Sequence, residues 1–242
     1  MNTFSDRIAV VTGASSGIGK AVTIALAERG AAVCLVGRNA NALKEVAEGV
    51  RAKSPRSLWY QADITVDQDI RKLAININQD FRYIDILIHS AGFISLGRIE
   101  TGSLKDFDKH FQTNVRGPYA LTQALLPMLK LRQGQVVFIN SSAALNARAN
   151  VGQYAASKHA LKAIADSLRE EINSDGIRVV SIFPGRTATP MQAAVHQMEG
   201  TDYHPDRLMQ PEDIAGVVVH ALSLPRSAEL TDIMIRPLKK PQ

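Results

Sequence analysis

The chain contains a single cysteine and no long apolar run. Cys34 is the only cysteine among 242 residues, so no disulfide can form within the chain, and a reducing compartment is expected. The longest apolar runs fall well short of the roughly 18 residues that a membrane-spanning helix needs. Nothing at the N-terminus resembles a signal peptide, since Asp6 and Arg7 flank the first apolar segment. These absences predict a cytoplasmic protein with no membrane partner.

Segregated charge and metal-binding clusters are also lacking. The net charge is +5, but lysine and arginine are scattered among acidic residues along the chain, which argues against a nucleic-acid surface. The histidines show no metal-ligand spacing with one another or with carboxylates, so no metal site is expected. The apolar content of 45% suffices for a sizeable core, and no low-complexity stretch or linker interrupts the sequence. A single domain over residues 1–242 is therefore expected.

Short apolar segments alternate with helical patterns along the chain. The segments expected to be strands are residues 8–12, 32–36, 57–61, 84–89, 135–140, 178–183 and 232–235. The segments expected to be helices are residues 20–29, 39–53, 67–80, 104–132, 154–174 and 211–224. This alternation predicts an α/β fold, a single doubly wound parallel sheet of about seven strands (a Rossmann fold) with helices on both faces. The loops that carry the motifs then lie at one edge of the sheet, where the strands end.

A glycine-rich turn joins the first strand to the first helix. Its sequence is Gly13-Ala14-Ser15-Ser16-Gly17-Ile18-Gly19. Glycines let the backbone approach a pyrophosphate closely, and the N-terminus of the following helix offers unpaired N–H groups. The order strand, glycine turn, helix predicts a dinucleotide site. The alternative is a flexible turn that binds no ligand.

A second motif, Tyr154-Ala155-Ala156-Ser157-Lys158, lies in a segment with a helical pattern. Residues four apart share one face of a helix, so the phenol and the ammonium are expected to lie together. A neighbouring ammonium favours the phenolate and would lower the pKa of Tyr154 from its usual value of about 10. Such a tyrosine could exchange a proton with a substrate oxygen near neutral pH.

Together these motifs resemble the short-chain dehydrogenase/reductase family, and the resemblance covers nearly the whole chain. Several other positions fall in the family's order, namely Asp63, Ala91-Gly92, Asn114, Ser141, Pro184-Gly185 and Thr189. Among these, Asp63 resembles the family's aspartate that holds the adenine ring of the cofactor. The resemblance implies cofactor contacts at Gly13, Ser15, Ser16, Gly17, Ile18, Gly19, Arg38, Asp63, Ile64, Ala91, Gly92, Asn114, Tyr154, Lys158, Pro184, Gly185, Thr187 and Thr189.

The resemblance also implies four catalytic residues: Asn114, Ser141, Tyr154 and Lys158. Tyr154 would donate its proton to a carbonyl oxygen or remove one from an alcohol, and Ser141 would hydrogen-bond that oxygen. Lys158 would lower the pKa of Tyr154 and bind the nicotinamide ribose. The backbone of Asn114 would hold a water that relays protons to the lysine. Ser142 is the alternative to Ser141, but Ser141 lies at the expected spacing of thirteen residues before Tyr154.

The end of the second strand, Gly37-Arg38, bears on the choice of cofactor. A carboxylate at this point would bond the free ribose hydroxyl of NAD(H) and repel a 2′-phosphate. This chain has glycine there, followed by an arginine that could pair with the phosphate. The pair resembles the members that prefer NADP(H), and NAD(H) is the other possible coenzyme. The alternative is a solvated Arg38 that selects nothing.

The predicted activity is an NADP(H)-dependent oxidoreductase that interconverts a carbonyl and a secondary alcohol. The alternative is an NADP(H)-binding regulatory or sensing protein with little turnover. Substrate choice is expected to depend on residues 143–153 and on residues 186–210, which lack a strong period and are predicted to form a long substrate loop. One departure from the family is His89-Ser90, which replaces the usual Asn-Asn.

Relatives in this family usually form dimers or tetramers by packing long helices of neighbouring subunits, so a homodimer or homotetramer is expected. The helical segments 104–132 and 154–174 would supply these surfaces. Candidate contacts are Val115, Leu121, Leu125 and Leu168. The alternative is that these apolar residues face their own sheet.

Overall fold

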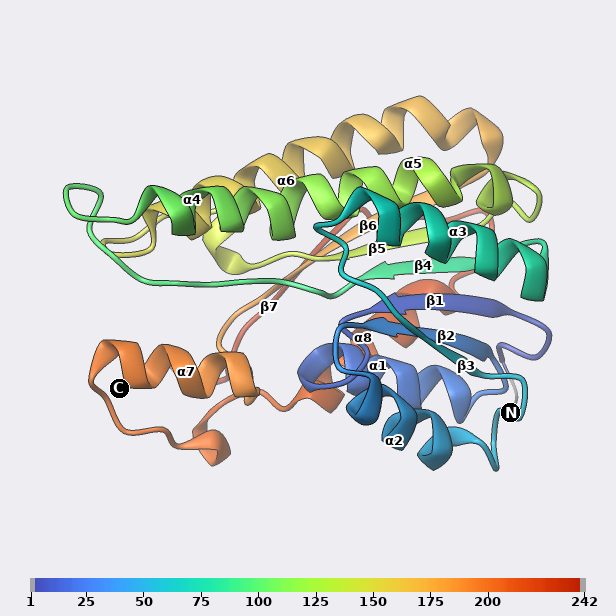
Figure 1. Cartoon of the computed structure of the whole chain (residues 1–242), viewed down its shortest axis with the longest axis horizontal. Coiled ribbons are helices and arrows are strands. Elements are labelled where there is room, and N and C mark those ends of the chain that lie inside the picture. Colours follow the sequence, from blue (N-terminus) through green and yellow to red (C-terminus); the bar gives the residue numbers. More distant parts are fainter. Residues whose placement is uncertain (1–2, 240–242) are drawn as a thin grey trace.

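Figure 1 shows the computed structural model of the chain, in which residues 3–239 are described. Within these residues the strands are β1 (Ile8–Thr12), β2 (Ala32–Gly37), β3 (Leu58–Gln61), β4 (Ile86–His89), β5 (Gln135–Ile139), β6 (Arg178–Pro184) and β7 (Asp232–Ile235). The α-helices are α1 (Gly17–Ala27), α2 (Ala40–Val50), α3 (Asp67–Phe81), α4 (Leu104–Phe111), α5 (Gly117–Lys130), α6 (Gly152–Ile172), α7 (Pro190–Glu199) and α8 (Pro211–Ser223).

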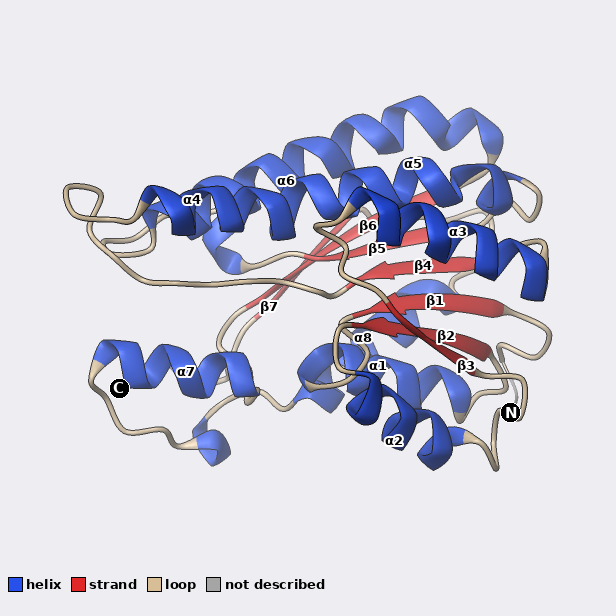
Figure 2. Cartoon of the chain, viewed as in Figure 1, coloured by secondary structure: helices blue, strands red, loops and turns tan. Residues whose placement is uncertain are grey.

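The strands form one parallel sheet in the order β3-β2-β1-β4-β5-β6-β7, as Figure 2 shows in red. From β3, at one edge of the sheet, the chain crosses back through α3 to β4 beside β1, and the strand order changes direction between β1 and β4. Every residue of β1 is buried, because helices cover both faces of a doubly wound sheet. All seven strands lie within one or two residues of the segments predicted from the sequence, and the predicted fold class is confirmed.

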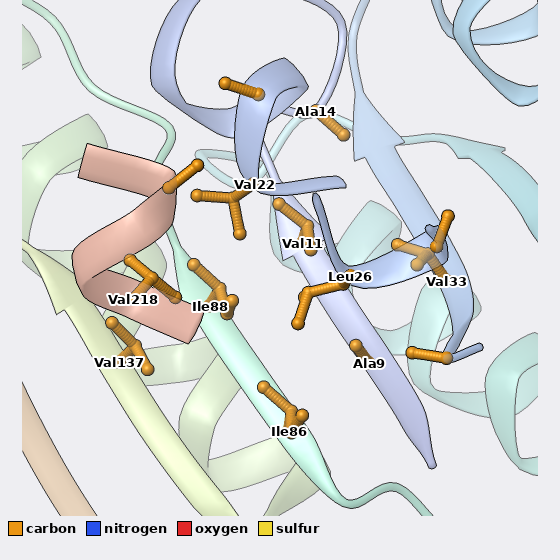
Figure 3. Close-up of a cluster of buried hydrophobic side chains, with 14 of the residues drawn as sticks. Ala9, Val11, Ala14, Val22, Leu26, Val33, Ile86, Ile88, Val137 and Val218 are labelled. Carbon is orange, nitrogen blue, oxygen red and sulfur yellow. The ribbon is translucent and has the colours of Figure 1, made fainter. Parts of the chain in front are cut away.

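Two apolar cores lie on opposite faces of the sheet. Figure 3 shows the first, in which Val11 and Ile88 of the sheet pack against Leu26 of α1 and Val218 of α8. The second core packs α3, α5 and α6 against the other face. Leu121 and Leu125 are fully buried in this second core and Leu168 packs against it, so these leucines face their own sheet. The prediction that they are subunit contacts is therefore wrong for the two fully buried ones.

The segment predicted as one helix over residues 104–132 is interrupted. A π-helical turn at Gln112–Arg116 separates α4 from α5. At its end, a Cβ on Gly117 would lie 2.8 Å from the carbonyl oxygen of Ile64, so glycine permits close packing of α5 on the loop after β3. The turn carries Asn114 into the protein interior. Single turns of this kind often occur at functional sites.

Residues 186–210, predicted to be irregular, contain the helix α7. Thr189 caps its N-terminus by accepting a hydrogen bond from the backbone N–H of Gln192 (3.1 Å), and Pro190 occupies the first helical position. Gly200 ends it in the left-handed conformation (φ 66°). The helix lies apart from the sheet, beyond the carboxyl ends of the strands (Figure 1).

Candidate active site

A large cleft opens at the carboxyl ends of the strands. Its volume is about 1400 Å³, and it is bounded by the loops after β1, β2, β4, β5 and β6 and by α7. All residues predicted to contact a cofactor line this cleft except Asn114, which is buried behind it. Parallel strands bring their carboxyl ends together, and this is why motifs more than a hundred residues apart in sequence meet here.

The glycine turn has the shape of an anion-binding cradle. Gly13 has φ 68°, and a Cβ there would lie 2.9 Å from the backbone nitrogen of Ala91. A Cβ on Gly19 would clash with the carbonyl oxygen of Gly13. The helix α1 begins at Gly17, and the side chain of Ser16 makes no capping hydrogen bond to its first turn. The backbone N–H groups of that turn thus remain available to a phosphate group, so these residues fit a dinucleotide.

The loops after β1 and β4 are joined through Thr12. Its Oγ1 accepts hydrogen bonds from the backbone nitrogens of Ser90 (3.1 Å) and Ala91 (3.2 Å) and donates to the carbonyl oxygen of Ile88 (3.3 Å). Because these contacts use the backbone of Ser90, the serine at this position does not disturb them. His89 is buried and stacks on Phe138.

Tyr154 lies in the first turn of α6 and is only 9% exposed. Burial raises the pKa of its phenol, and a hydrogen bond with the side chain of Ser141 opposes part of this increase. The sequence-based expectation of a pKa lowered by Lys158 is therefore wrong for this structure, because the cost of burying a phenolate dominates. Ser141 ends the segment after β5, where its Oγ also accepts a hydrogen bond from the backbone N–H of Ala143 (3.1 Å).

Lys158 lies one turn further along α6. Its Nζ is 5.9 Å from the centre of the Tyr154 ring and donates a hydrogen bond to the carbonyl oxygen of Ile139 (3.1 Å). Burial lowers the pKa of Lys158 to about 8, since a buried ammonium loses its hydration. Tyrosine and lysine therefore share one face of α6, as predicted, but the ammonium is bonded to the end of β5.

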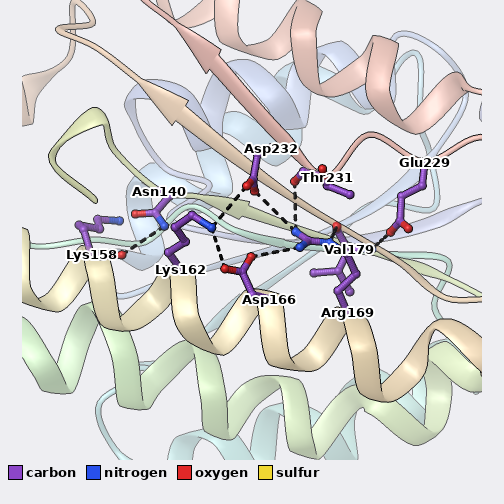
Figure 4. A network of polar contacts seen from close by, with 9 residues as sticks. All are labelled: Asn140, Lys158, Lys162, Asp166, Arg169, Val179, Glu229, Thr231 and Asp232. Carbon is purple, nitrogen blue, oxygen red and sulfur yellow. Dashed lines mark hydrogen bonds and ion pairs between the residues drawn. The ribbon is translucent and has the colours of Figure 1, made fainter. Parts of the chain in front are cut away.

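The helix α6 is anchored at several points along this face (Figure 4). The side-chain amide of Asn140 donates to the carbonyl oxygen of Lys158 (3.3 Å). Further along, Lys162 and Arg169 both pair with Asp166, and both also reach Asp232 of β7, at 3.4 and 3.7 Å respectively. These contacts fix the helix against β5 and β7 and so hold Tyr154 and Lys158 in position.

Asn114 is held by three hydrogen bonds. Its side-chain amide donates to the carbonyl oxygen of Phe93 (2.9 Å) and to Oγ of Ser157 (3.0 Å), and its Oδ1 accepts from the backbone N–H of Phe93 (2.8 Å). Ser157 in turn donates to the carbonyl oxygen of Tyr154 (2.7 Å). The asparagine thus connects the loop after β4 to the helix of the tyrosine. Neither Phe93 nor Ser157 was singled out in the sequence.

The opposite end of the cleft contains Arg38 and Asp63. The side chain of Arg38 is exposed and makes no ion pair with any residue in the range 3–239. Gly37 leaves the end of β2 without a carboxylate. Asp63 accepts hydrogen bonds at Oδ1 from the backbone nitrogen (2.9 Å) and Oγ1 (2.7 Å) of Thr65, which orients its carboxylate at the cleft.

The helix α7 forms a wall of the cleft within the segment predicted as the substrate loop, but a helix in this segment was not predicted from the sequence. Its side chains Met191, Gln192 and Val195 line the cavity. Arg186 forms two hydrogen bonds with Glu199 at the end of the helix (2.8 and 2.6 Å), so the helix is tied back to the loop after β6. The signals that could have located the helix are the cap Thr189-Pro190 at its start and Gly200 at its end.

Within residues 3–239, no helix is both long and apolar enough to cross a lipid bilayer. In the same range, no three histidine, cysteine or acidic side chains are grouped so that they could hold a metal ion.

Comparison with known proteins reveals relatives over almost the whole chain. The family model for short chain dehydrogenases matches residues 7–200. An uncharacterised oxidoreductase of Staphylococcus epidermidis is 34% identical over 234 residues, which cover 96% of this chain and 98% of that protein. Another, from Staphylococcus aureus, is 33% identical over 241 residues, which cover 98% of this chain and all of that protein.

Solved structures agree with these matches. A protein of Shigella flexneri 2a assigned to the short chain dehydrogenases, solved in complex with NADP, is 33% identical with a TM-score of 0.88 and covers 96% of this chain and 98% of its own. One from Escherichia coli CFT073, solved in complex with NADPH, is 32% identical with a TM-score of 0.88 and the same coverage.

Proposed function

The chain belongs to the short-chain dehydrogenase/reductase family, and from this we propose that it is an NADP(H)-dependent oxidoreductase that interconverts a carbonyl and a secondary alcohol. The observation that carries the proposal is the phenol of Tyr154, hydrogen-bonded to Ser141 at the wall of a cleft that also contains the glycine cradle. A nucleotide could bind in this cleft without a phenol hydroxyl, whereas proton exchange with a substrate oxygen uses one.

Some residues of the cleft bind the coenzyme, and others take part in proton transfer. The glycine turn and the N-terminus of α1 bind the pyrophosphate. When bound, the nicotinamide coenzyme supplies the hydride for reduction and accepts it in oxidation. Ser141 and Tyr154 hold the substrate oxygen, and Tyr154 donates a proton to it as the carbonyl becomes an alcohol. Because burial raises the pKa of Tyr154, the phenol is protonated at neutral pH and ready to act as the acid.

Lys158 and Asn114 support this proton transfer. With a pKa of about 8, Lys158 is mostly charged at neutral pH, and its positive charge 5.9 Å from the Tyr154 ring favours the phenolate that forms when the proton leaves. We assign Lys158 to the nicotinamide ribose hydroxyls as well. Asn114 holds the loop after β4 and, through Ser157, the backbone of Tyr154.

The coenzyme proposed is NADP(H), with NAD(H) as a weaker alternative. Arg38 offers an exposed, unpaired guanidinium at the cleft, and Gly37 provides no carboxylate to bond a free 2′-hydroxyl. The relatives solved with NADP and NADPH support this choice, since they cover the same part of the chain.

A regulatory or sensing protein with little turnover is the second candidate function. It would keep the coenzyme cradle and would not need Tyr154. The decisive experiment is Tyr154→Phe, which keeps the ring and removes the hydroxyl, assayed by NADPH oxidation with a panel of ketones, aldehydes and keto acids. Turnover should fall by about 10²–10⁴, as for the loss of a general acid, while NADPH binding measured by calorimetry is retained.

Tyr119→Phe is the matched control, because this phenol is 48% exposed on the outer side of α5. It should leave turnover unchanged. Turnover of Tyr154→Phe within a factor of about two of the wild type would reject the assignment of the acid. Absence of turnover in the wild type itself, with NADPH still bound, would favour the sensing protein.

We also propose that the protein is a cytoplasmic homodimer or homotetramer assembled through the outer faces of α5 and α6. The inner faces of these helices are occupied by the core, and the exposed Tyr119 and Leu131 lie on the outside. Light scattering at micromolar concentration should give at least twice the mass of the 26.3 kDa chain. A monomer under these conditions would contradict the proposed assembly.

A further inference from the structure

The loop between Ser141 and Tyr154 contains an arginine that faces the cleft. Ser141 precedes a short 3₁₀ turn (Ser142–Ala144), and Tyr154 follows at the start of α6, so residues 145–151 connect the two groups proposed to hold the substrate oxygen. Arg148 lies in the middle of this connection and lines the cleft together with Leu145 and Asn146. Its position relative to the reacting oxygen is therefore set by a short segment of backbone.

This segment is held by backbone hydrogen bonds. The carbonyl oxygen of Asn150 accepts from the N–H of Gly97 in the loop after β4 (2.8 Å). The carbonyl oxygen of Arg148 itself accepts from the N–H of Val151 (3.4 Å), and the N–H of Asn146 donates to Ser142 (3.2 Å). The backbone of Arg148 is thus fixed on both sides, which presents its side chain at the cleft in a defined place.

The guanidinium of Arg148 has no partner in the described chain. It is exposed, and no hydrogen bond, ion pair or aromatic contact of its side chain occurs with any of residues 3–239. Arg186, which lines the same cleft, is neutralised by its two hydrogen bonds to Glu199. The other acidic residues that line the cavity, Asp63 after β3 and Asp202 beyond the end of α7, do not pair with Arg148 either.

The cleft that Arg148 lines also has apolar side chains. They are Ile94, Leu96, Leu145, Val151, Met191 and Val195. These side chains suit the carbon skeleton of a small substrate, but none of them can balance the charge of a guanidinium. A planar guanidinium matches a carboxylate through two parallel hydrogen bonds, which fix both the distance and the direction of the bound group.

From this arrangement we propose that the substrate carries a carboxylate and that Arg148 binds it. The inference rests on the proposed oxidoreductase function and specifies its substrate class as keto acids and the corresponding hydroxy acids. The carboxylate remains unchanged during the reaction. Its contact with Arg148 at one end, and the contact of the carbonyl oxygen with Tyr154 and Ser141 at the other, orient the substrate for hydride transfer.

The test compares keto acids with their methyl esters, which keep the carbon skeleton and lose the charge. The wild type should have a higher kcat/KM for the acid of each reactive pair. Arg148→Gln should lower kcat/KM for the acid about ten- to a hundredfold, mainly through KM, and leave kcat/KM for the ester nearly unchanged. Butanoate, which has the carboxylate and no carbonyl, should inhibit the wild type competitively and the variant at least tenfold more weakly.

Arg236→Gln is the matched control, since Arg236 is another exposed arginine that lines the cleft, at the end of β7. It should leave the preference for acids intact. The inference is overturned if the wild type prefers the esters, if Arg148→Gln slows acid and ester equally, or if Arg236→Gln has the same effect as Arg148→Gln. A wild type that reduces neither acids, esters, ketones nor aldehydes would overturn the proposed function, and the inference with it. Reduction of neutral carbonyls alone leaves the function standing and rejects only the carboxylate.

Discussion

His89 should make the protein sensitive to mild acid. It is the last residue of β4, only 2% exposed, with its ring stacked on Phe138 at a centroid distance of 4.9 Å. Nε2 lies 2.8 Å from Oγ1 of Thr122, whereas Nδ1 is buried with no hydrogen-bond partner in the described chain. Burial lowers the pKa of His89 to about 3, because no acidic group compensates for the lost hydration of an imidazolium.

The sign of the effect follows from proton linkage. In the unfolded chain a histidine has a pKa of about 6.5, so below that pH the unfolded state binds a proton that the native state does not. The stabilisation from a neutral His89 is present above pH 6.5 and is lost as the pH falls from 6.5 towards 3. The loss is about 1.4 kcal/mol per pH unit, and it amounts to about 2 kcal/mol at pH 5 relative to pH 7.5.

The measurement is the free energy of unfolding in urea, followed by circular dichroism at pH 7.5 and pH 5.0 and at one protein concentration. His89→Asn should be less stable than the wild type at pH 7.5, since it loses the stacked ring. Its loss of stability between the two pH values should, however, be smaller by about 2 kcal/mol. His110, whose pKa burial also lowers, contributes equally to both proteins and cancels in the difference.

His220→Asn serves as the control, because this histidine is exposed on α8. It should show the same pH-dependent loss as the wild type. If His89→Asn and the wild type lose equal stability between pH 7.5 and pH 5.0, His89 either titrates normally or is not buried, and the reasoning fails.

Two further predictions concern the ends of the cleft. Wild-type kcat/KM should favour NADPH over NADH about ten- to a hundredfold, since a guanidinium–phosphate pair contributes about 1.5–3 kcal/mol. The double substitution Gly37→Asp with Arg38→Ile should reverse this preference. Equal or better kcat/KM with NADH in the wild type would contradict the prediction. Glu199→Gln should release α7 from Arg186 and raise the substrate KM several-fold, with little change in the coenzyme KM. An equal rise in both KM values would show that the Arg186–Glu199 pair does not act by positioning α7 against the substrate.

Much of the fold was predictable because its signals are local. The strand β1 is a run of apolar, mostly β-branched residues that is buried throughout, as a strand covered on both faces must be. The amphipathic period of α2 likewise identifies the side that packs on the sheet, which includes Leu43 and Val46. Because the carboxyl ends of parallel strands lie at one edge of the sheet, the order of strands and helices also predicts that the loops after the strands lie close together.

Features set by contacts between distant segments were not predictable. The π-helical turn that carries Asn114 depends on the close approach of Gly117 to Ile64 and on the bonds to the backbone of Phe93, none of which has a periodic signature. The subunit contacts proposed for Leu121 and Leu125 failed for a related reason. Apolar residues on a helix show which face is buried, but not whether the sheet of the same chain or another subunit covers it.

The direction of the pKa shift of Tyr154 was also not predictable from the sequence, because it depends on burial. A spacing of four residues on a helix correctly places the phenol and the ammonium on one face, and from this alone a lowered pKa follows. The sequence does not reveal that both groups are buried, nor that Lys158 donates to the carbonyl oxygen of Ile139. Burial disfavours the charged form of each group, so it raises the pKa of the phenol and lowers that of the ammonium. The two pKa values, which are almost equal for the free groups at about 10 and about 10.4, are thereby moved apart, so Tyr154 holds its proton more tightly than Lys158 does.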